Sequence, residues 1–375
     1  MFLARRELVF ARGRFALMGA VVALISILMV LLSGLSVGLA NDGVSGLQRI
    51  PVDAFAFQKD VSKDSAFSRS VVGPDAVDAW RDRDDVADAT ALGNTLVNAR
   101  TDRDVEIDLA LFGVERGSFV DPEVESGTRL AREGEVVISA TAAEQGIEPG
   151  DTITVEPAGT ELTVVGVLAD QHTFGHVDIG YLPLRSWQEI RAGVRPGDEV
   201  PPRVYEEFTA VALQAAGDGI DLAAGDEAAG TTSMTRETSY GASPGYTAET
   251  STLSLIQWFL YAISALVVGA FFTVLTIQRR QEIAVLRAMG AGTGWLLRDS
   301  LVQSLILLVL SAGTGIAIGL AGGALIASTP MPFALEAGPI AGATALLLTL
   351  GLAGAAVAVL RITRVDPLNA LGGSR

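Results

Sequence analysis

Four long apolar runs without a charged residue constrain the fold of this 375-residue chain more than any other feature. Each run is long enough for the ~20 residues with which a helix crosses ~30 Å of hydrocarbon. A buried helix of a water-soluble protein rarely continues so far without a charge. The sequence therefore predicts four transmembrane helices, within residues 15–39, 253–278, 301–329 and 338–360.

The first run could instead be a secretory signal, because arginines precede it at Arg5, Arg6, Arg12 and Arg14. The apolar core of a signal is usually ~7–15 residues long and is followed by a cleavage site of small residues. Because the run is longer than that, an uncleaved membrane anchor is favoured. The small residues at 36–40 leave cleavage open as the alternative.

Charged residues divide the chain into two parts. Segment 40–251 carries most of the 43 acidic residues, whereas arginines outnumber acids elsewhere. The positive-inside rule therefore predicts a multi-pass protein of the cell membrane, with both termini and the loop 279–297 cytoplasmic and segment 40–251 outside. The formal net charge of −16 makes nucleic-acid binding unexpected.

The sequence contains no recognisable catalytic constellation. The chain has no cysteine, which excludes disulfides, thiol catalysis and thiolate metal sites. Neither of its two lysines, Lys59 and Lys63, stands in a phosphate-binding loop, and no Gly-x-Ser-x-Gly occurs. The only histidines, His172 and His176, have the spacing of zinc ligands on a helix, but Gly175 and the surrounding β pattern favour a surface loop. We therefore expect a subunit that is not an enzyme, holds no cofactor or metal, and takes its energy from a partner.

Segment 40–251 is predicted to be an α+β domain. Strand alternation is clear at 135–139, 152–155 and 162–168, with turn residues between these stretches. Residues 217–245 are rich in Gly, Ala, Ser, Thr and acids, and this composition predicts a linker or mobile flap.

A short charged segment, 279–291, separates the second and third apolar runs. Ile283, Leu286 and Met289 recur at helical spacing, and charged residues lie on the flanks of this stripe. The pattern predicts an amphipathic helix that lies against a partner rather than crossing the bilayer. Its predicted contact residues are Arg279, Arg280, Glu282, Leu286, Arg287 and Met289.

Small residues four positions apart predict close helix packing. Gly34 and Gly38 form such a pair in the first run, and Gly315 and Gly319 belong to a longer stripe in the third. Such residues let another helix approach closely. Packing within one subunit and packing between two copies explain the pattern equally well.

Met29, Tyr246 and Glu249 are the candidate substrate-binding residues. A thioether, a phenol and a carboxylate are iron-porphyrin ligand types still available to a chain without cysteine. Met29 lies within the first run, and Tyr246 and Glu249 precede the second. Each has a structural alternative: Met29 as packing, Tyr246 as an interfacial anchor and Glu249 as a helix N-terminal acid.

Together these features resemble the permease subunit of a type VII, MacB/FtsX-like ABC transporter. The resemblance covers nearly the whole chain and is most specific in segment 279–291, in the strands between 135 and 168, and in the Arg364-Val365-Asp366-Pro367 tail. It implies that 279–291 is the coupling helix that docks on a separate ATPase. It also implies two copies of this chain with two ATPase copies, in contact with membrane lipid.

Two shorter stretches are similar to the branch of haem-exporting HrtB-like and DevC-like permeases. They are Pro244-Gly245-Tyr246-x-Ala248-Glu249 and residues 271–278. This similarity implies that haem is a substrate rather than a cofactor, and it favours Met29 and Glu249 as its ligands.

The expected fold is a membrane protein with four transmembrane α-helices and a large α+β extracytoplasmic domain between the first and second. The predicted order is an amphipathic N-terminal helix at 1–14, spans at 15–39, 252–278, 298–329 and 338–360, the domain at 40–251, the coupling loop at 279–297, an outer loop at 330–337 and a tail at 361–375.

The favoured function is efflux of an amphiphile, with haem as the leading candidate, by mechanotransmission from the ATPase. One alternative is export of a lipid, peptide or antibiotic. Another is a signalling subunit that regulates a cell-wall hydrolase or a sensor kinase.

Overall fold

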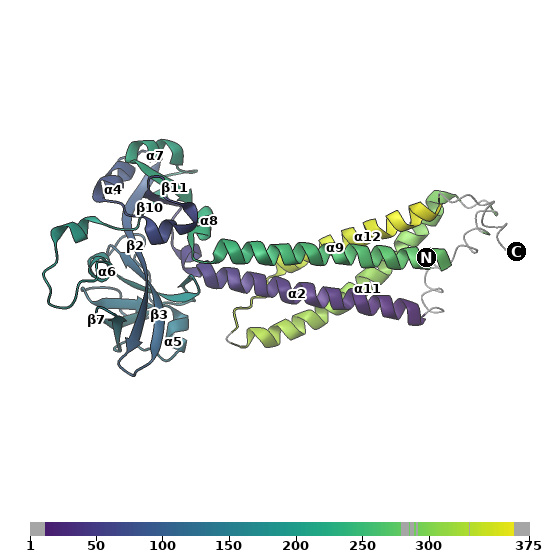
Figure 1. Ribbon diagram of the computed structural model, residues 1–375, viewed down its shortest axis with the longest axis horizontal. Coiled ribbons are helices and arrows are strands. Elements are labelled where there is room, and N and C mark those ends of the chain that lie inside the picture. Colours follow the sequence, from purple (N-terminus) through teal and green to yellow (C-terminus); the bar gives the residue numbers. More distant parts are fainter. Residues whose placement is uncertain (1–11, 279–284, 286–288, 290–291, 330, 364–375) are drawn as a thin grey trace. The chain divides into compact units, whose positions relative to one another are not determined.

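The computed structural model describes residues 12–278, 285, 289, 292–329 and 331–363 (Figure 1). The chain divides into two compact units. The transmembrane unit comprises Met1–Gly38 and Ser251–Arg375, and the α+β domain comprises Leu39–Thr250.

Four helices in the described residues are long and apolar enough to cross a membrane. The α+β domain lies between the first and second of them, so the predicted fold class is confirmed. These helices are α2 (Arg12–Arg49), α9 (Tyr246–Gln278), α11 (Thr293–Ala327) and α12 (Ala337–Thr363) (Figure 1).

Helix α2 continues ten residues beyond the apolar run that predicted it. The run ends at residue 39, but the helix ends at Arg49. Val44 and Leu47 on this extension are fully buried in the α+β domain. The extension is therefore stabilised by burial within the domain, which the end of the apolar run does not reveal.

Helices α2 and α11 approach closely at two glycines of α11. A Cβ atom at Gly315 would lie 2.3 Å from the Ala23 carbonyl oxygen, and one at Gly319 would lie 2.9 Å from Val30 Cβ. Such distances leave no room for a side chain. Because glycine has none, the two helices can come into contact at these positions.

The glycine pair of α2 contacts a loop rather than another helix. The ring of Phe333 lies where a side chain at Gly34 would project, and the Pro332 carbonyl oxygen lies 2.3 Å from a Cβ placed at Gly38. The Ala334 N–H also donates to the Gly34 carbonyl oxygen at 3.0 Å. The segment that enters α12 is thereby held on α2.

The α+β domain contains eleven strands in one sheet. They are β1 (Ala54–Gln58), β2 (Val86–Thr101), β3 (Glu106–Val114), β4 (Ser126–Gly127), β5 (Glu135–Ile138), β6 (Thr152–Glu156), β7 (Thr160–Val167), β8 (Thr173–Phe174), β9 (Val177–Pro183), β10 (Ala210–Ala215) and β11 (Thr231–Thr235). Their order is β11-β1-β10-β2-β3-β9-β5-β7-β4, while β6 pairs with β2 and β7, and β8 pairs with β9. The pairs β3/β9 and β5/β7 are parallel and the others are antiparallel.

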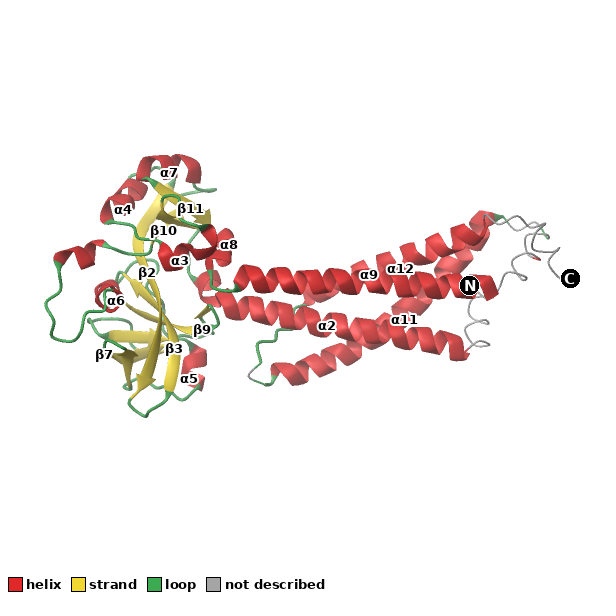
Figure 2. Ribbon diagram, viewed as in Figure 1, coloured by secondary structure: helices red, strands yellow, loops and turns green. Residues whose placement is uncertain are grey.

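Short helices cover the sheet and connect its strands (Figure 2). They are η1 (Lys63–Ser65), α3 (Ala66–Arg69), α4 (Pro74–Arg81), α5 (Ala140–Glu144), α6 (Leu184–Arg191), η2 (Pro202–Glu206), α7 (Leu222–Ala229), α8 (Arg236–Ser239) and η3 (Tyr240–Ala242).

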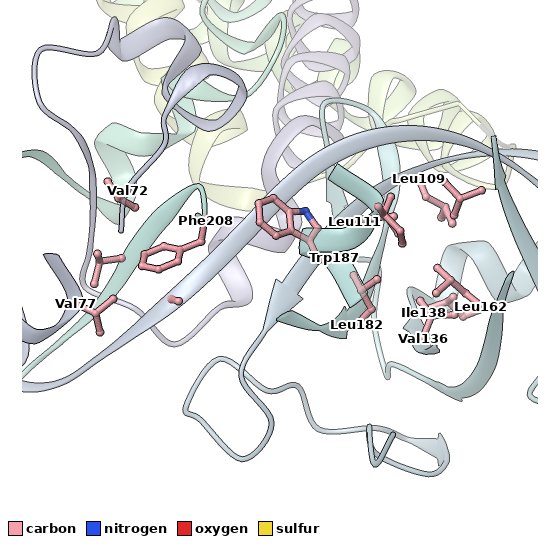
Figure 3. Close-up of a cluster of buried hydrophobic side chains, with 14 of the residues drawn as sticks. Val72, Val77, Leu109, Leu111, Val136, Ile138, Leu162, Leu182, Trp187 and Phe208 are labelled. Carbon is pink, nitrogen blue, oxygen red and sulfur yellow. The ribbon is translucent and has the colours of Figure 1, made fainter. Parts of the chain in front are cut away.

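The two faces of the sheet carry separate hydrophobic clusters. Along β3, Leu109 and Leu111 face one cluster, while Ala110 and Phe112 face the other, as the two-residue period of a strand requires. Figure 3 shows Leu109 and Leu111 with Trp187 of α6 in the first cluster. Burial on both faces fixes the register of the central strands, since a one-residue slip would exchange the two sets.

The prediction of a linker or flap at 217–245 was wrong in this structure, because the segment forms α7, β11, α8 and η3. Asp221 caps α7 by accepting from the Ala224 N–H at 3.1 Å, and Gly230 ends it at a φ of 64°. Strand β11 then pairs with β1 and buries Met234. The small residues allow close packing, as where Gly225 lies against the Trp80 ring, and do not indicate flexibility.

Candidate functional site

A cavity of about 300 Å³ lies within the transmembrane unit, between α2, α9 and α12. Its wall combines apolar and hydrogen-bonding groups. Met29, Ser33, Ser36 and Val37 come from α2, Gln257, Leu260 and Tyr261 from α9, and Pro339 and Ala343 from α12. Polar side chains at membrane depth are costly unless they face a cavity or a partner, so this clustering marks a candidate binding site.

Met29 contributes to both the cavity and the packing of the helices. Its side chain lines the cavity, yet the residue is only 6% exposed and belongs to the hydrophobic cluster of the transmembrane unit. The sequence left ligand and packing roles as alternatives for Met29, and its position is compatible with both.

A second cluster lies in the α+β domain, at the tip of the β8–β9 hairpin. Phe174 and Val177 pair across a two-residue turn formed by Gly175 and His176. Both turn residues have positive φ angles, 61° and 66°, as a type I′ hairpin turn requires. The turn presents the His176 imidazole at the end of the hairpin.

His176 contacts one carboxylate from each of two long helices. Its Nδ1 lies 2.9 Å from Asp42 Oδ2 on α2, and its Nε2 lies 3.0 Å from Glu249 Oε2 on α9. The three side chains are partly buried, with exposed fractions of 28%, 22% and 39% for His176, Asp42 and Glu249. Distances of this size are those of N–H···O hydrogen bonds.

Backbone hydrogen bonds hold the hairpin tip in place. The Gly175 N–H donates to the Gly43 carbonyl oxygen at 3.0 Å and to Ser243 Oγ at 3.1 Å. The Ser243 hydroxyl in turn donates to the same Gly43 carbonyl at 2.8 Å. The hairpin, α2 and the segment before α9 are therefore joined independently of the imidazole.

The structure places the other two candidate ligands in the α+β domain. Tyr246 stacks edge-on against Tyr240, with ring centroids 6.2 Å apart. Glu249 lies in the first turn of α9, where a carboxylate is favoured by the helix dipole, and contacts His176. The helix N-terminal alternative for Glu249 thus has a geometric counterpart.

Sequence reasoning did not predict the contact between His176 and Asp42. The two residues are separated by 134 positions, so no local spacing relates them. One signal was available: Asp42 and Glu249 are acids close to the ends of the two apolar runs that flank the domain. Two acids at these positions are compatible with a shared hydrogen-bond donor.

The other histidine has a different environment. His172 Nδ1 lies 3.1 Å from the Asp170 carbonyl oxygen, and its ring packs edge-on against Tyr181. Burial lowers the pKa of His172, and this outweighs the opposite effect of the Asp170 carbonyl.

Most of the predicted coupling segment lies outside the described residues. This applies to Arg279, Arg280, Glu282, Leu286 and Arg287. Met289 is described: its N–H donates to the Val285 carbonyl oxygen at 3.0 Å, and its side chain is 72% exposed.

Two protein families match the chain. Residues 17–228, more than half of the chain, match the MacB-like periplasmic core domain. Residues 254–367 match the FtsX-like permease C-terminal family.

Full-length relatives agree with these families. The chain is 24% identical over 377 residues to the "Putative hemin transport system permease protein HrtB" of Staphylococcus haemolyticus, covering 100% of this chain and 99% of the relative. It is 22% identical over 387 residues to an uncharacterized ABC transporter permease of Mycobacterium tuberculosis, with coverage of 100% and 99%.

Two solved domains are also similar. The periplasmic region of MacB from Actinobacillus actinomycetemcomitans aligns with 51% of this chain and 92% of its own, with 13% identity and a TM-score of 0.37. The extracellular domain of the transporter YknZ from Gram-positive bacteria aligns with 49% and 99%, with 16% identity and a TM-score of 0.35. By its family matches, the chain is a multi-pass membrane protein with an extracytoplasmic α+β domain, and it belongs to the MacB/FtsX-like permeases of ABC transporters.

Proposed function

We propose that this permease is the transmembrane subunit of an efflux pump that expels an amphiphile, with haem as the leading candidate. The observation that carries the proposal is the cavity between α2, α9 and α12. It combines apolar walls with a thioether, two serine hydroxyls, an amide and a phenol, which is the mixture that an amphiphilic ligand needs.

Haem is favoured over other amphiphiles by two considerations. Met29, Tyr246 and Glu249 offer side chains of the types that can bind haem iron. In addition, full-length relatives carry the description of hemin transport permeases.

The family implies an ATPase partner, and we propose that two copies of each subunit assemble. The termini and the segment 279–291 would lie in the cytoplasm, where this segment docks on the ATPase. Closure of the ATPase pair on ATP would push the segment and move the helices, so that the amphiphile leaves the membrane outward without crossing an aqueous pore.

Haemin titration of the purified full-length protein tests the substrate. We expect a shifted Soret band on binding, and an altered band in Met29→Ala and Glu249→Ala, because each change removes a proposed ligand. Tyr246→Phe removes only the hydroxyl and tests the phenol in the same way.

Matched control variants distinguish the loss of a ligand from a general loss of protein stability. Met18→Ala changes the same residue type on the same helix, at a buried position that does not line the cavity. Glu237→Ala removes a surface acid of α8. A Soret band unchanged in Met29→Ala and Glu249→Ala would remove both residues from the site.

The coupling role is tested by placing charges on the apolar stripe of segment 279–291. Leu286→Asp and Met289→Asp should abolish co-purification of the ATPase, since each buries a carboxylate in the proposed contact. Met331→Asp is the control, because Met331 is also an exposed methionine but lies in the loop before α12. Retained ATPase pairing in the first two variants would contradict the coupling role.

The phenotype of a deletion strain distinguishes efflux from signalling. A strain that lacks this chain should become sensitive to haemin and accumulate it in its membranes. Defective septa or a lost transcriptional response, with haemin tolerance unchanged, would instead support the signalling alternative. Sensitivity to another amphiphile alone would redirect the substrate to a lipid, peptide or antibiotic.

A further inference from the structure

We infer that His176, itself oriented by Asp42, is a positioning residue that holds the Glu249 carboxylate ready to bind its ligand. This inference rests on the proposed function, in which Glu249 is a ligand of the haem iron. It assigns a role to two residues that no motif in the sequence relates to Glu249.

The backbone aims the imidazole before any side-chain contact is made. His176 occupies a turn position with a φ of 66°, which few residues other than glycine adopt, although His, Asn and Asp do so more often than most. The neighbouring Gly175 N–H is bonded to Gly43 and Ser243. The ring therefore projects from a support that does not depend on Glu249.

The imidazole is fixed at both nitrogens. Nδ1 contacts Asp42, and the Gln171 side-chain amide donates to the other oxygen of that carboxylate at 2.9 Å. Rotation of the ring would break the contact with Asp42. Nε2 is thereby held 3.0 Å from Glu249 Oε2.

Glu249 keeps one carboxylate oxygen available. Among the described residues, Oε2 contacts His176, while Oε1 has no hydrogen-bond partner. A Cβ atom at Gly245 would lie 3.1 Å from Oε1, so the glycine leaves the approach to this oxygen open. Carboxylates that bind metals are commonly held by one outer hydrogen bond in this way, and losing it typically lowers affinity 10- to 100-fold.

Two substitutions at His176 each keep one of its two contacts and remove the other. The amide nitrogen of His176→Asn can replace Nδ1 and keep Asp42, but does not reach Glu249. The longer amide of His176→Gln can replace Nε2 and keep Glu249. Asn adopts a positive φ more readily than Gln does. Loss of function in His176→Asn would therefore not be explained by backbone strain.

Haemin titration of the full-length protein at constant pH gives the test. We expect His176→Asn to raise the haemin Kd about tenfold or more while the saturated Soret band stays at its wild-type position. His176→Gln should weaken binding less than His176→Asn does, and Asp42→Ala should weaken binding because it removes the contact that orients the ring. A change in folding would show as a lower thermal unfolding midpoint.

The outcomes distinguish this inference from the proposed function. Wild-type affinity in His176→Asn, or equal weakening in the Asn and Gln variants, overturns the positioning role, while an altered Soret band in Glu249→Ala would still support the ligand. An unaltered band in Glu249→Ala overturns the ligand assignment and the inference with it.

Discussion

At the scale of single residues, the packing of one hydrophobic cluster of the α+β domain requires two glycines. Gly93 on β2 and Gly113 on β3 face each other in register. Trp187 of α6 covers both: a Cβ atom would lie 2.2 Å from the ring at position 93, and 2.5 Å from Trp187 Cβ at position 113. Two opposed glycines thus provide the space in which Trp187 is fully buried.

Gly93→Ala and Gly113→Ala should each lower the free energy of unfolding by about 1–3 kcal/mol, the usual cost of overpacking a close-packed core. Thermal or denaturant unfolding of the full-length protein measures this. Gly217→Ala is the control, because that glycine has open space and no positive φ. The cost of Gly93→Ala should also shrink in a Trp187→Ala background, and an undiminished cost there would contradict the account.

The burial of His172 predicts a pH dependence of stability. Because the pKa of His172 is lowered in the folded protein from its ordinary value of 6.5, the unfolded chain binds a proton more readily. Stability should therefore be lost as pH falls below about 6.5 and should be unaffected by this group above it. His172→Gln should reduce the fall in unfolding midpoint between pH 7.5 and pH 5, and an unchanged fall would contradict a role for His172.

The candidate site was only partly predictable at this scale. Met29, Tyr246 and Glu249 could be selected from the sequence because their side-chain types and their places near the apolar runs are local information. Asp42 and His176 could not, because their contact depends on the β8–β9 hairpin reaching α2. The turn signal at Gly175 favoured a loop, and the hairpin turn agrees with it, but the partner of the imidazole is set by tertiary structure.

At the scale of elements, the transmembrane helices were predictable because their signal is additive along the sequence. A run without charges indicates a membrane span whatever it packs against. Residues 217–245 show the opposite case. Their small residues indicate flexibility only when nothing covers them, and here Gly225 lies against Trp80 while Met234, on the edge strand β11, is buried.

Contact between α2 and α11 predicts that neighbouring glycines on α11 respond differently to the same change. Gly315 lies against the Ala23 carbonyl, whereas Gly313 has nothing within 4 Å. Gly315→Leu should therefore lower the unfolding midpoint and the haemin tolerance of cells, since the helices must separate to admit the side chain. Gly313→Leu places the same side chain two residues away and should be tolerated; equal effects of both would show that the close approach is unimportant.

At the scale of the whole molecule, the division of charge predicts how the chain is oriented in the membrane. The chain lacks a phosphate-binding loop, so its family requires an ATPase partner, and that partner can act only on segments that face the cytoplasm. Arginines cluster at the termini and around 279–298, while acids concentrate in the α+β domain. The positive-inside rule converts this distribution into a topology that can be tested.

Single cysteines can map that topology cleanly, because the chain has none of its own. Met289→Cys and Met331→Cys are a matched pair of exposed methionines, and Gly217→Cys adds an open position in the α+β domain. A membrane-impermeant maleimide should label positions 217 and 331 in intact cells and position 289 only after permeabilisation. Labelling of position 289 in intact cells would place the coupling segment outside, beyond reach of any ATPase, and would leave the proposed pump without a source of work.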